Sequence, residues 1–404
     1  MKYWRGYLVA FIFGAIAYFL KAFGERFSTL IDMVYPYVIR TAQSMLAEWS
    51  AQVPYNLWQL CAVALGVIAL GSLVLMILLK WNPIQWAGWV LAAGAAVYAL
   101  HTLVFGLNYY AGPLADDIRM EVAEYNLEEL TDAAVYYRDK ANALAGQVRR
   151  DGEGNVLFSD FETLASQAGN GFENLTYEYS YPIFAGSRLP VKELGWADMY
   201  TSMGITGFTM GITGEAAVNP QIPDVSLPFT MCHEMAHRMC IAAEDDANFA
   251  AYLACMANES VEFQYSAYFM AYRYCYNAMA GAGTEAASAA AARVNNGVGE
   301  LLYRDMTAYS QFFASNRDDS ATRFANAVND TYLKTSGDEA GIASYGDVCD
   351  LLVNWHYKTI VLPTITETVK LFDPYDETQV DLSGIVNAKE QETQPEVDNP
   401  GGVG

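Results

Sequence analysis

The stretch LWQLCAVALGVIALGSLVLMILL, residues 57–79, contains no charged side chain. At a rise of about 1.5 Å per residue, a helix of this length crosses a hydrocarbon layer about 30 Å thick. The sequence therefore predicts a membrane-spanning helix here, and the flanking segments can be interpreted from it.

Two further spans are predicted on either side of this stretch. Residues 6–20 form a shorter apolar run, and a cleaved signal peptide would begin in a similar way. No small-x-small cleavage site follows the run, so we interpret it as an uncleaved first span. Residues 84–105 lack Asp, Glu, Lys and Arg, and they are flanked by aromatic side chains of the kind that favour a membrane interface: Trp81, Trp86, Tyr109 and Tyr110.

The short loops predict an orientation for the three spans. Lys2, Arg5 and Lys80 would all lie on the same side of the bilayer, and cationic residues in short loops mark the cytoplasmic side. We therefore expect a multi-pass protein of the cell membrane, with the lipid bilayer as a partner. The chain after the third span is expected to be extracytoplasmic.

Charge divides the chain in the same place. Of 404 residues with a net charge of −23, residues 1–106 carry six basic and three acidic side chains, and the rest carries 17 basic and 43 acidic ones. Phosphate binding relies on clustered cations, so nucleic acid is not expected as a partner. A hydrophobic content of 53% excludes disorder for most of the chain. We predict a transmembrane anchor over residues 1–112, an outer domain over 113–386, and a disordered acidic tail over 387–404.

The outer domain is predicted to be mainly helical, with a small sheet or hairpin. Apolar residues recur at helical spacing over residues 114–147, and a short helix is expected over 161–167. Two β-compatible runs, 205–209 and 215–218, are followed by a proline-rich loop. Thr230 is placed to cap a helix that begins near Met231.

That helix carries the pentad His233-Glu234-Met235-Ala236-His237. Residues four apart share one helix face, so both imidazoles can bind one Zn²⁺. Zinc lowers the pKa of a bound water to about 7, and Glu234 would act as the general base. The pattern predicts metal-assisted hydrolysis, usually of a peptide bond. The competing interpretation is a buried helix whose histidines are satisfied by hydrogen bonds, without a metal.

A zinc site of this type needs a third protein ligand. Glu244, Asp245 and Asp246 are the nearest acids, but on a continuous helix Glu244 would lie about 10 Å beyond His237. The chain must therefore turn between Arg238 and Ala243. If it does, Glu244 begins a second helix, and Asn248 lies one turn further on, where it could orient a ligand.

Several stretches resemble an uncharacterised bacterial family of membrane-anchored HExxH proteins, a domain of unknown function. The resemblance covers residues 219–253, the stretches 328–334, 344–346 and 350–352, and the spans up to residues 106–110. It implies a zincin-like zinc metalloprotease domain. This family commonly has Gly three residues after the second histidine, where the present chain has Cys240. A left-handed Cys costs about 1 kcal/mol or more, so either the bend moves or the site is weakened.

The segment from Glu244 to Asn248 also resembles the ExxAD-like ligand segment of membrane-associated zinc peptidases that cleave prenylated substrates. That resemblance implies Glu244 as the third ligand and Asn248 as a residue that supports it, although Asn248 replaces the usual Asp. Other zinc peptidases with this motif place a Glu about twenty residues after the second histidine. Glu259 and Glu262 therefore remain rivals.

The sequence gives weaker indications of the residues that would bind the substrate, assist catalysis or form a disulfide. Residues 208–217 could form a strand that holds a peptide substrate by main-chain hydrogen bonds. His356 and Tyr345 are candidate donors to a developing oxyanion. Cys240 is a conceivable metal ligand, and Cys255 with Cys275 could bridge two helices.

We therefore expect a membrane-anchored zinc metallopeptidase that acts on a peptide or protein substrate. Its fold class is mostly α, with three transmembrane helices before a mainly helical domain. The alternative is a catalytically inactive membrane protein whose outer helical domain binds a partner or a cell-envelope ligand.

Overall fold

The computed structural model describes residues 2–336 and 348–364. Residues 1–355 form one compact unit, and the chain from His356 onward forms a second. The predicted acidic tail, 387–404, lies outside the described residues, as does Tyr345. The predicted boundary at residue 112 stays a prediction.

Three helices are long and apolar enough to cross a membrane: α1 (Arg5–Arg26), α3 (Leu57–Leu78) and α4 (Pro83–Val104). Their bounds agree with the three predicted spans. Asn82 caps α4 by accepting a hydrogen bond from the Gln85 N–H, and Pro83 occupies the first helical position, where its missing N–H costs nothing.

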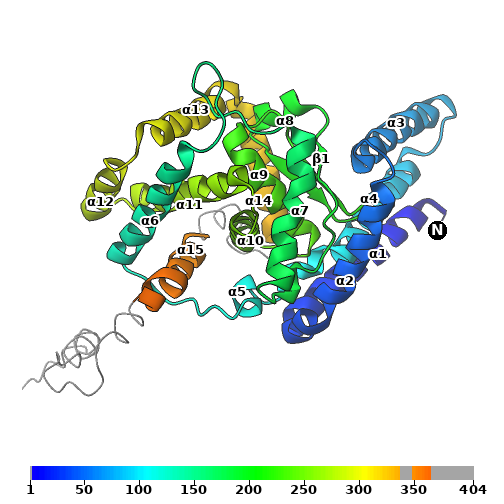
Figure 1. Cartoon of the computed structure of the whole chain (residues 1–404). Helices are drawn as coiled ribbons and strands as arrows, with labels where there is room; N and C mark the ends of the chain where they lie inside the picture. The colour runs from blue at the N-terminus through cyan, green and yellow to red at the C-terminus, as the bar shows by residue number, and fades with distance from the viewer. Residues whose placement is uncertain (1, 337–347, 365–404) are drawn as a thin grey trace, which may run out of the picture. The chain divides into compact units, whose positions relative to one another are not determined.

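Helices α1 and α4 pack closely against each other (Figure 1). The backbones of Gly6 and Gly88 meet so tightly that a Cβ on either glycine would clash with the partner helix. Small side chains continue both buried faces and allow this approach: Ala10, Ala17 and Gly24 on α1, with Ala92, Ala99 and Thr102 on α4.

The segment between the first two spans is a long helix, α2 (Ser28–Ser50), that packs onto later parts of the chain. Arg40 donates to the carbonyls of Met239 and Pro182, and the Gln43 amide donates to the Gly211 carbonyl. Helix α2 is therefore bound directly to elements of the predicted outer domain.

After α4, the chain continues through η2 (Gly106–Tyr110), a single turn of helix, α5 (Leu114–Asp117), and an irregular stretch. The prediction of one helix over 114–147 is wrong, because α6 (Leu127–Ala145) begins only after Asn126. The Asn126 side chain accepts the N–H groups of Glu128 and Glu129, and Glu129 accepts the Asn126 N–H in return. This capping box fixes the start of the helix.

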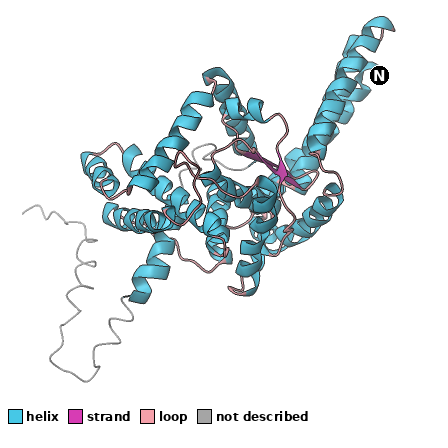
Figure 2. Ribbon diagram, turned by 45° about the horizontal axis from the view of Figure 1, so that its top comes forward, coloured by secondary structure: helices cyan, strands magenta, loops and turns pink. Residues whose placement is uncertain are grey.

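Three short strands form the sheet, drawn in magenta in Figure 2. Strands β2 (Gly207–Met210) and β3 (Glu215–Val218) pair antiparallel, with Phe208 opposite Ala217, which confirms the predicted hairpin. Strand β1 (Lys192–Glu193) joins β3 in parallel, so the order is β1-β3-β2 and β2 lies at an edge.

A buried carboxylate ties this sheet to the second apolar helix. Glu215 on the central strand accepts the backbone N–H groups of Leu57 and Trp58, the first two residues of α3, and pairs with Lys192 at 2.6 Å. The unpaired N–H groups and positive end of a helix dipole favour an anion there. The sheet therefore holds the end of α3.

The remaining helices surround a buried core. Helix α9 (Leu227–Arg238) and helix α10 (Glu244–Met256) lie inside it, next to each other and to helices α7 and α11 (Figure 1). The other elements are η3 (Pro182–Phe184), η4 (Asp224–Ser226), α7 (Phe161–Tyr177), α8 (Ala197–Met203), α11 (Val261–Gly281), α12 (Glu285–Asn295), α13 (Glu300–Asn316), α14 (Asp319–Ser336), α15 (Val348–His356) and a π-helical turn, Tyr357–Val361.

The predicted length of α7 and the predicted start of the pentad helix are both wrong. Helix α7 is ten residues longer than the predicted 161–167. The pentad helix begins at Leu227, and Thr230 lies inside it, donating its hydroxyl to the Ser226 carbonyl. Pro228 at the second helical position is compatible with this earlier start, because the first N–H groups of a helix have no partner within it.

Candidate metal centre

Helix α9 places the two histidines of the pentad on one face. His233 and His237 are one turn apart, and their Nε2 atoms are separated by 3.1 Å. The helix is buried along nearly its whole length, so both imidazoles face the protein interior. The predicted juxtaposition of the two rings is therefore present.

The chain then turns sharply, as the position of Glu244 requires. The N–H of Cys240 donates to the His237 carbonyl and the N–H of Ile241 donates to the Ala236 carbonyl. These two bonds form the Schellman pattern, with Cys240 in the left-handed position that glycine usually occupies. Its φ of 74° shows that the bend has not moved to accommodate the side chain.

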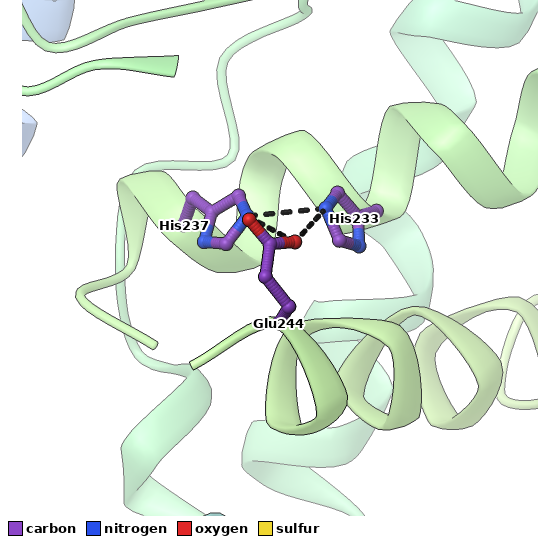
Figure 3. A group of neighbouring side chains, drawn as sticks. All are labelled: His233, His237 and Glu244. Atoms are coloured by element: carbon purple, nitrogen blue, oxygen red, sulfur yellow. Dashed lines mark hydrogen bonds and ion pairs between the residues drawn. The ribbon is translucent and has the colours of Figure 1, made fainter. Parts of the chain in front are cut away.

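Glu244 is the first residue of α10 and reaches back to the histidines (Figure 3). Its Oε2 atom lies 3.3 Å from His233 Nε2 and 3.5 Å from His237 Nε2. Among the described residues, these three side chains form the group whose ligand atoms lie close enough together to hold a metal ion. All three are buried.

The donor atoms fit a tetrahedral metal. Ligand atoms about 2.0–2.1 Å from a tetrahedral zinc are about 3.3–3.4 Å apart, close to the separations of this group. The His237 Nδ1 atom lies 2.8 Å from the Ile241 carbonyl, which favours the proton on Nδ1 and leaves Nε2 free to bind metal. Glu244 Oε2 is buried and accepts no well-formed hydrogen bond among the described residues, a need that a cation would meet.

At this site, burial and the neighbouring charges shift the pKa values of His237 and Glu244 in opposite directions. Burial disfavours the charged form of His237, but Glu244 and Glu234 raise its pKa to about 9. Burial also disfavours charged Glu244, yet the two histidines hold its pKa well below the usual range. The histidines and Glu244 thus stabilise each other's charged forms, and a divalent cation bound between them would compete with protons for the same atoms.

Glu234 lies between the two histidines in sequence and contacts the edge strand. The Thr209 hydroxyl lies 2.7 Å from Glu234 Oε2, within hydrogen-bond distance. Gly207 passes so close that a Cβ there would overlap the carboxylate. Burial raises the pKa of Glu234, while the histidines and Thr209 act in the opposite direction. The carboxylate is thus oriented by β2, which sequence reasoning had considered only as a substrate-binding strand.

The rival ligands lie in other surroundings. Glu262 accepts the Ser159 N–H at 2.9 Å and pairs with Arg149 at 3.5 Å, and Glu259 is exposed. Asp246, another of the nearest acids in sequence, is buried and accepts the Leu114 N–H instead of approaching the histidines. Glu244 is therefore the acid that the fold brings to the histidines.

Asn248 lies one turn after Glu244, as expected, but its side-chain hydrogen bond is to a residue outside the metal-binding group. Its Oδ1 atom accepts the Tyr274 hydroxyl at 3.0 Å, and its buried Nδ2 atom has no hydrogen-bond partner among the described residues. The role predicted for Asn248 in orienting a ligand stays a prediction. His356 is the last residue of α15, and its role as an oxyanion donor also stays a prediction.

The cysteines are arranged differently from the prediction. Cys240 faces Arg40 and Asn108 and is not part of the metal-binding group. Cys255 neighbours Cys232, and Cys275 neighbours Cys349, so the bridge that Cys255 and Cys275 could have formed is not present. All six cysteines are free thiols in the structure.

Comparison with known proteins gives one match. The model of a family described as "Protein of unknown function (DUF3810)" matches residues 32–353. No curated protein and no solved structure matches the chain. The matched range includes α2 from residue 32 onward, both later apolar helices and the complete metal-binding group.

Metal binding should depend on Glu244 and not on its rival. We expect Glu244→Gln to lower bound zinc at least about tenfold, because the variant loses one of three ligands. Metal content of the purified full-length chain, measured by mass spectrometry, tests this. Glu262→Gln is the matched control and should retain the wild-type content. Equal losses in the two variants would contradict the assignment.

The bend should be strained by its side chain. We expect Cys240→Gly to stabilise the protein by about 1 kcal/mol, because glycine adopts the left-handed conformation without a steric penalty. Cys240→Ala removes the thiol and keeps the Cβ, so it serves as the control and should give no such gain. Thermal unfolding in detergent measures both; a higher midpoint for alanine than for glycine would refute the strain.

Proposed function

This chain belongs to the family described as protein of unknown function DUF3810, and we propose that it is a membrane-anchored zinc metallopeptidase. Its substrate is a polypeptide on the extracytoplasmic side of the membrane. The observation that carries the proposal is the group of His233, His237 and Glu244, together with the buried carboxylate of Glu234 from the same helix.

The arrangement supplies the parts that hydrolysis needs. His233, His237 and Glu244 would hold the zinc, and three protein ligands would leave room for a water molecule. When bound, zinc would acidify that water and polarise a peptide carbonyl. Glu234 accepts the proton, because its carboxylate is held beside the histidines by Thr209. The same group can then return the proton to the leaving amine.

The edge strand supports peptide binding. Strand β2 pairs on one side with β3, and as an edge strand it presents main-chain N–H and C=O groups on the other. An extended substrate can add to such an edge by backbone hydrogen bonds, with little dependence on its side chains. Contact between β2 and Glu234 would bring the bound peptide bond next to the general base.

The orientation of the domain rests on the short loops. With Lys2, Arg5 and Lys80 in the cytoplasm, α1 and α4 both run outward, and α2 lies outside together with the metal centre. The bonds from α2 to residues near the centre are compatible with this arrangement. The active site would therefore work close to the outer membrane surface.

Glu234→Gln separates catalysis from metal binding. We expect the variant to keep its zinc and to lose hydrolysis by about a hundredfold or more, because the amide cannot accept the proton. A peptide library digested with the full-length protein, together with metal analysis, measures both properties. Wild-type protein that contains zinc but cleaves no member of the library would favour the alternative of an inactive binding domain. Unchanged turnover in the variant would remove Glu234 from the mechanism.

Thr209→Val should shift the pH dependence. The hydroxyl stabilises the ionised carboxylate of Glu234 and lowers its pKa, so its removal raises that pKa. Activity requires the ionised base, and the acidic limb of the kcat/KM profile should therefore move to higher pH. Thr213→Val, in the same hairpin, is the control, because the Thr213 hydroxyl faces the Met210 carbonyl. A shift toward lower pH in Thr209→Val would contradict the role of this hydrogen bond.

A further inference from the structure

A cavity of about 270 Å³ lies beside the metal centre and is not used by the proposed mechanism. Its walls come from α2, η2 and the segment after it, α5, and the turn between α9 and α10. Four carboxylates line it, and we call it the acidic cavity after them: Asp32, Asp117, Asp245 and Asp246.

The acidic cavity shares a chain segment with the metal centre. Cys240, Ile241, Ala242, Ala243, Asp245 and Asp246 line the cavity, and Glu244, between them in sequence, turns to the histidines. An occupant of the cavity would therefore contact the residues that position the third ligand.

One cation, Arg40, lies near Asp117, and its buried Nη2 atom has no hydrogen-bond partner among the described residues. Arg40 acts on Asp117 through its charge, but its guanidinium donates to the carbonyls of Met239 and Pro182, and no ion pair to Arg40 is present among the described residues. Burial, and then the charge of Asp32, raise the pKa of Asp117 to about 6. Asp32, which is exposed, and Asp117, which is partly buried, thus repel each other, and a cation in the cavity would stabilise their charged forms.

A buried amide gives the second, independent indication of a ligand. Asn108 lines the acidic cavity and is only 4% exposed, yet neither its Nδ2 nor its Oδ1 atom has a hydrogen-bond partner among the described residues. The polar group near it is the Cys240 thiol, which is a weak partner. Buried amides normally form hydrogen bonds, so Asn108 is suited to bind a group that enters the cavity.

The walls favour an extended organic cation over a metal ion. The acids of the cavity do not bring three ligand atoms together, in contrast to the group formed by His233, His237 and Glu244. Apolar and aromatic residues lie between them, including Pro36, Tyr37 and Ile183. An arginine or lysine side chain matches this mixture, because an aliphatic stem carries a charged head with several donors.

We infer that the acidic cavity is a specificity subsite that receives a guanidinium or ammonium side chain of the substrate polypeptide. This inference rests on the proposed function, because that function makes the occupant part of a polypeptide substrate. The cavity and its binding of a cation do not require catalysis. Several carboxylates can share the five donors of a guanidinium, and the Asn108 carbonyl oxygen can accept one more.

Peptide binding to the inactive variant tests the subsite without turnover. The full-length Glu234→Gln protein in phosphatidylglycerol nanodiscs is titrated with a fluorescent alanine heptapeptide amide that carries one arginine, and with its citrulline counterpart, which has the same shape and no charge. We expect the arginine peptide to bind about tenfold or more tightly, as hydrogen bonds to a charged group imply. Equal affinities would overturn the subsite.

Substitutions in the cavity, with a control elsewhere, test whether the preference for arginine arises in the acidic cavity. Adding Asp117→Asn should remove most of the preference for arginine, because Asp117 lines the cavity and forms no ion pair in the structure. Asp32→Asn serves the same purpose if the first variant fails to fold, because Asp32 also lines the cavity. Glu300→Gln, at an exposed position on α13, is the control and should leave the preference unchanged. A preference that survives both aspartate substitutions would place the basic side chain elsewhere and overturn the inference.

Two further outcomes distinguish the peptidase proposal from the cation subsite, and a peptide occupant from a lipid. Arginine preference in the Glu234→Gln protein, with no hydrolysis by the wild type, would reject the peptidase and retain the cation subsite. Loss of the preference in phosphatidylethanolamine nanodiscs alone would show that a lipid amine occupies the cavity and would overturn the peptide assignment.

Discussion

The metal centre depends on one turn of the backbone, at the end of α9. A straight helix would carry Glu244 away from His237, and the two hydrogen bonds around Cys240 reverse the chain before this happens. The same turn places the Ile241 carbonyl against the His237 imidazole, so a single feature provides a ligand and orients another. Strain at Cys240 is acceptable because packing and two hydrogen bonds hold the turn on both sides.

The apolar helices are connected to this centre through buried polar contacts. Glu215 holds the start of α3 from the central strand, and Gln43 and Arg40 on α2 hold the loops around the hairpin and the turn. Each of these groups would be costly to bury alone, and each finds its partners on a different segment. The sheet and the pentad helix are therefore fixed relative to the ends of the apolar helices.

Several of the acidic residues lie together in the folded protein. The excess of carboxylates was first an argument against nucleic acid, but several of them gather around one cavity beside the third ligand. Burial, and then the charge of Asp32, raise the pKa of Asp117. The fold thus brings together acidic residues that are far apart in the sequence.

Local patterns in the sequence determined the three apolar helices, the hairpin and the one-turn spacing of the two histidines, because each depends on periodicity over a few consecutive residues. The starts of α6 and α9 were misplaced, since the caps that set them compete with neighbouring signals. Only the tertiary structure decided that Glu244 and not Glu262 meets the histidines, that Thr209 orients Glu234, and that Asp246 is buried. Those contacts depend on which distant segments pack together, and the periodicity of one segment does not indicate which other segments it will contact.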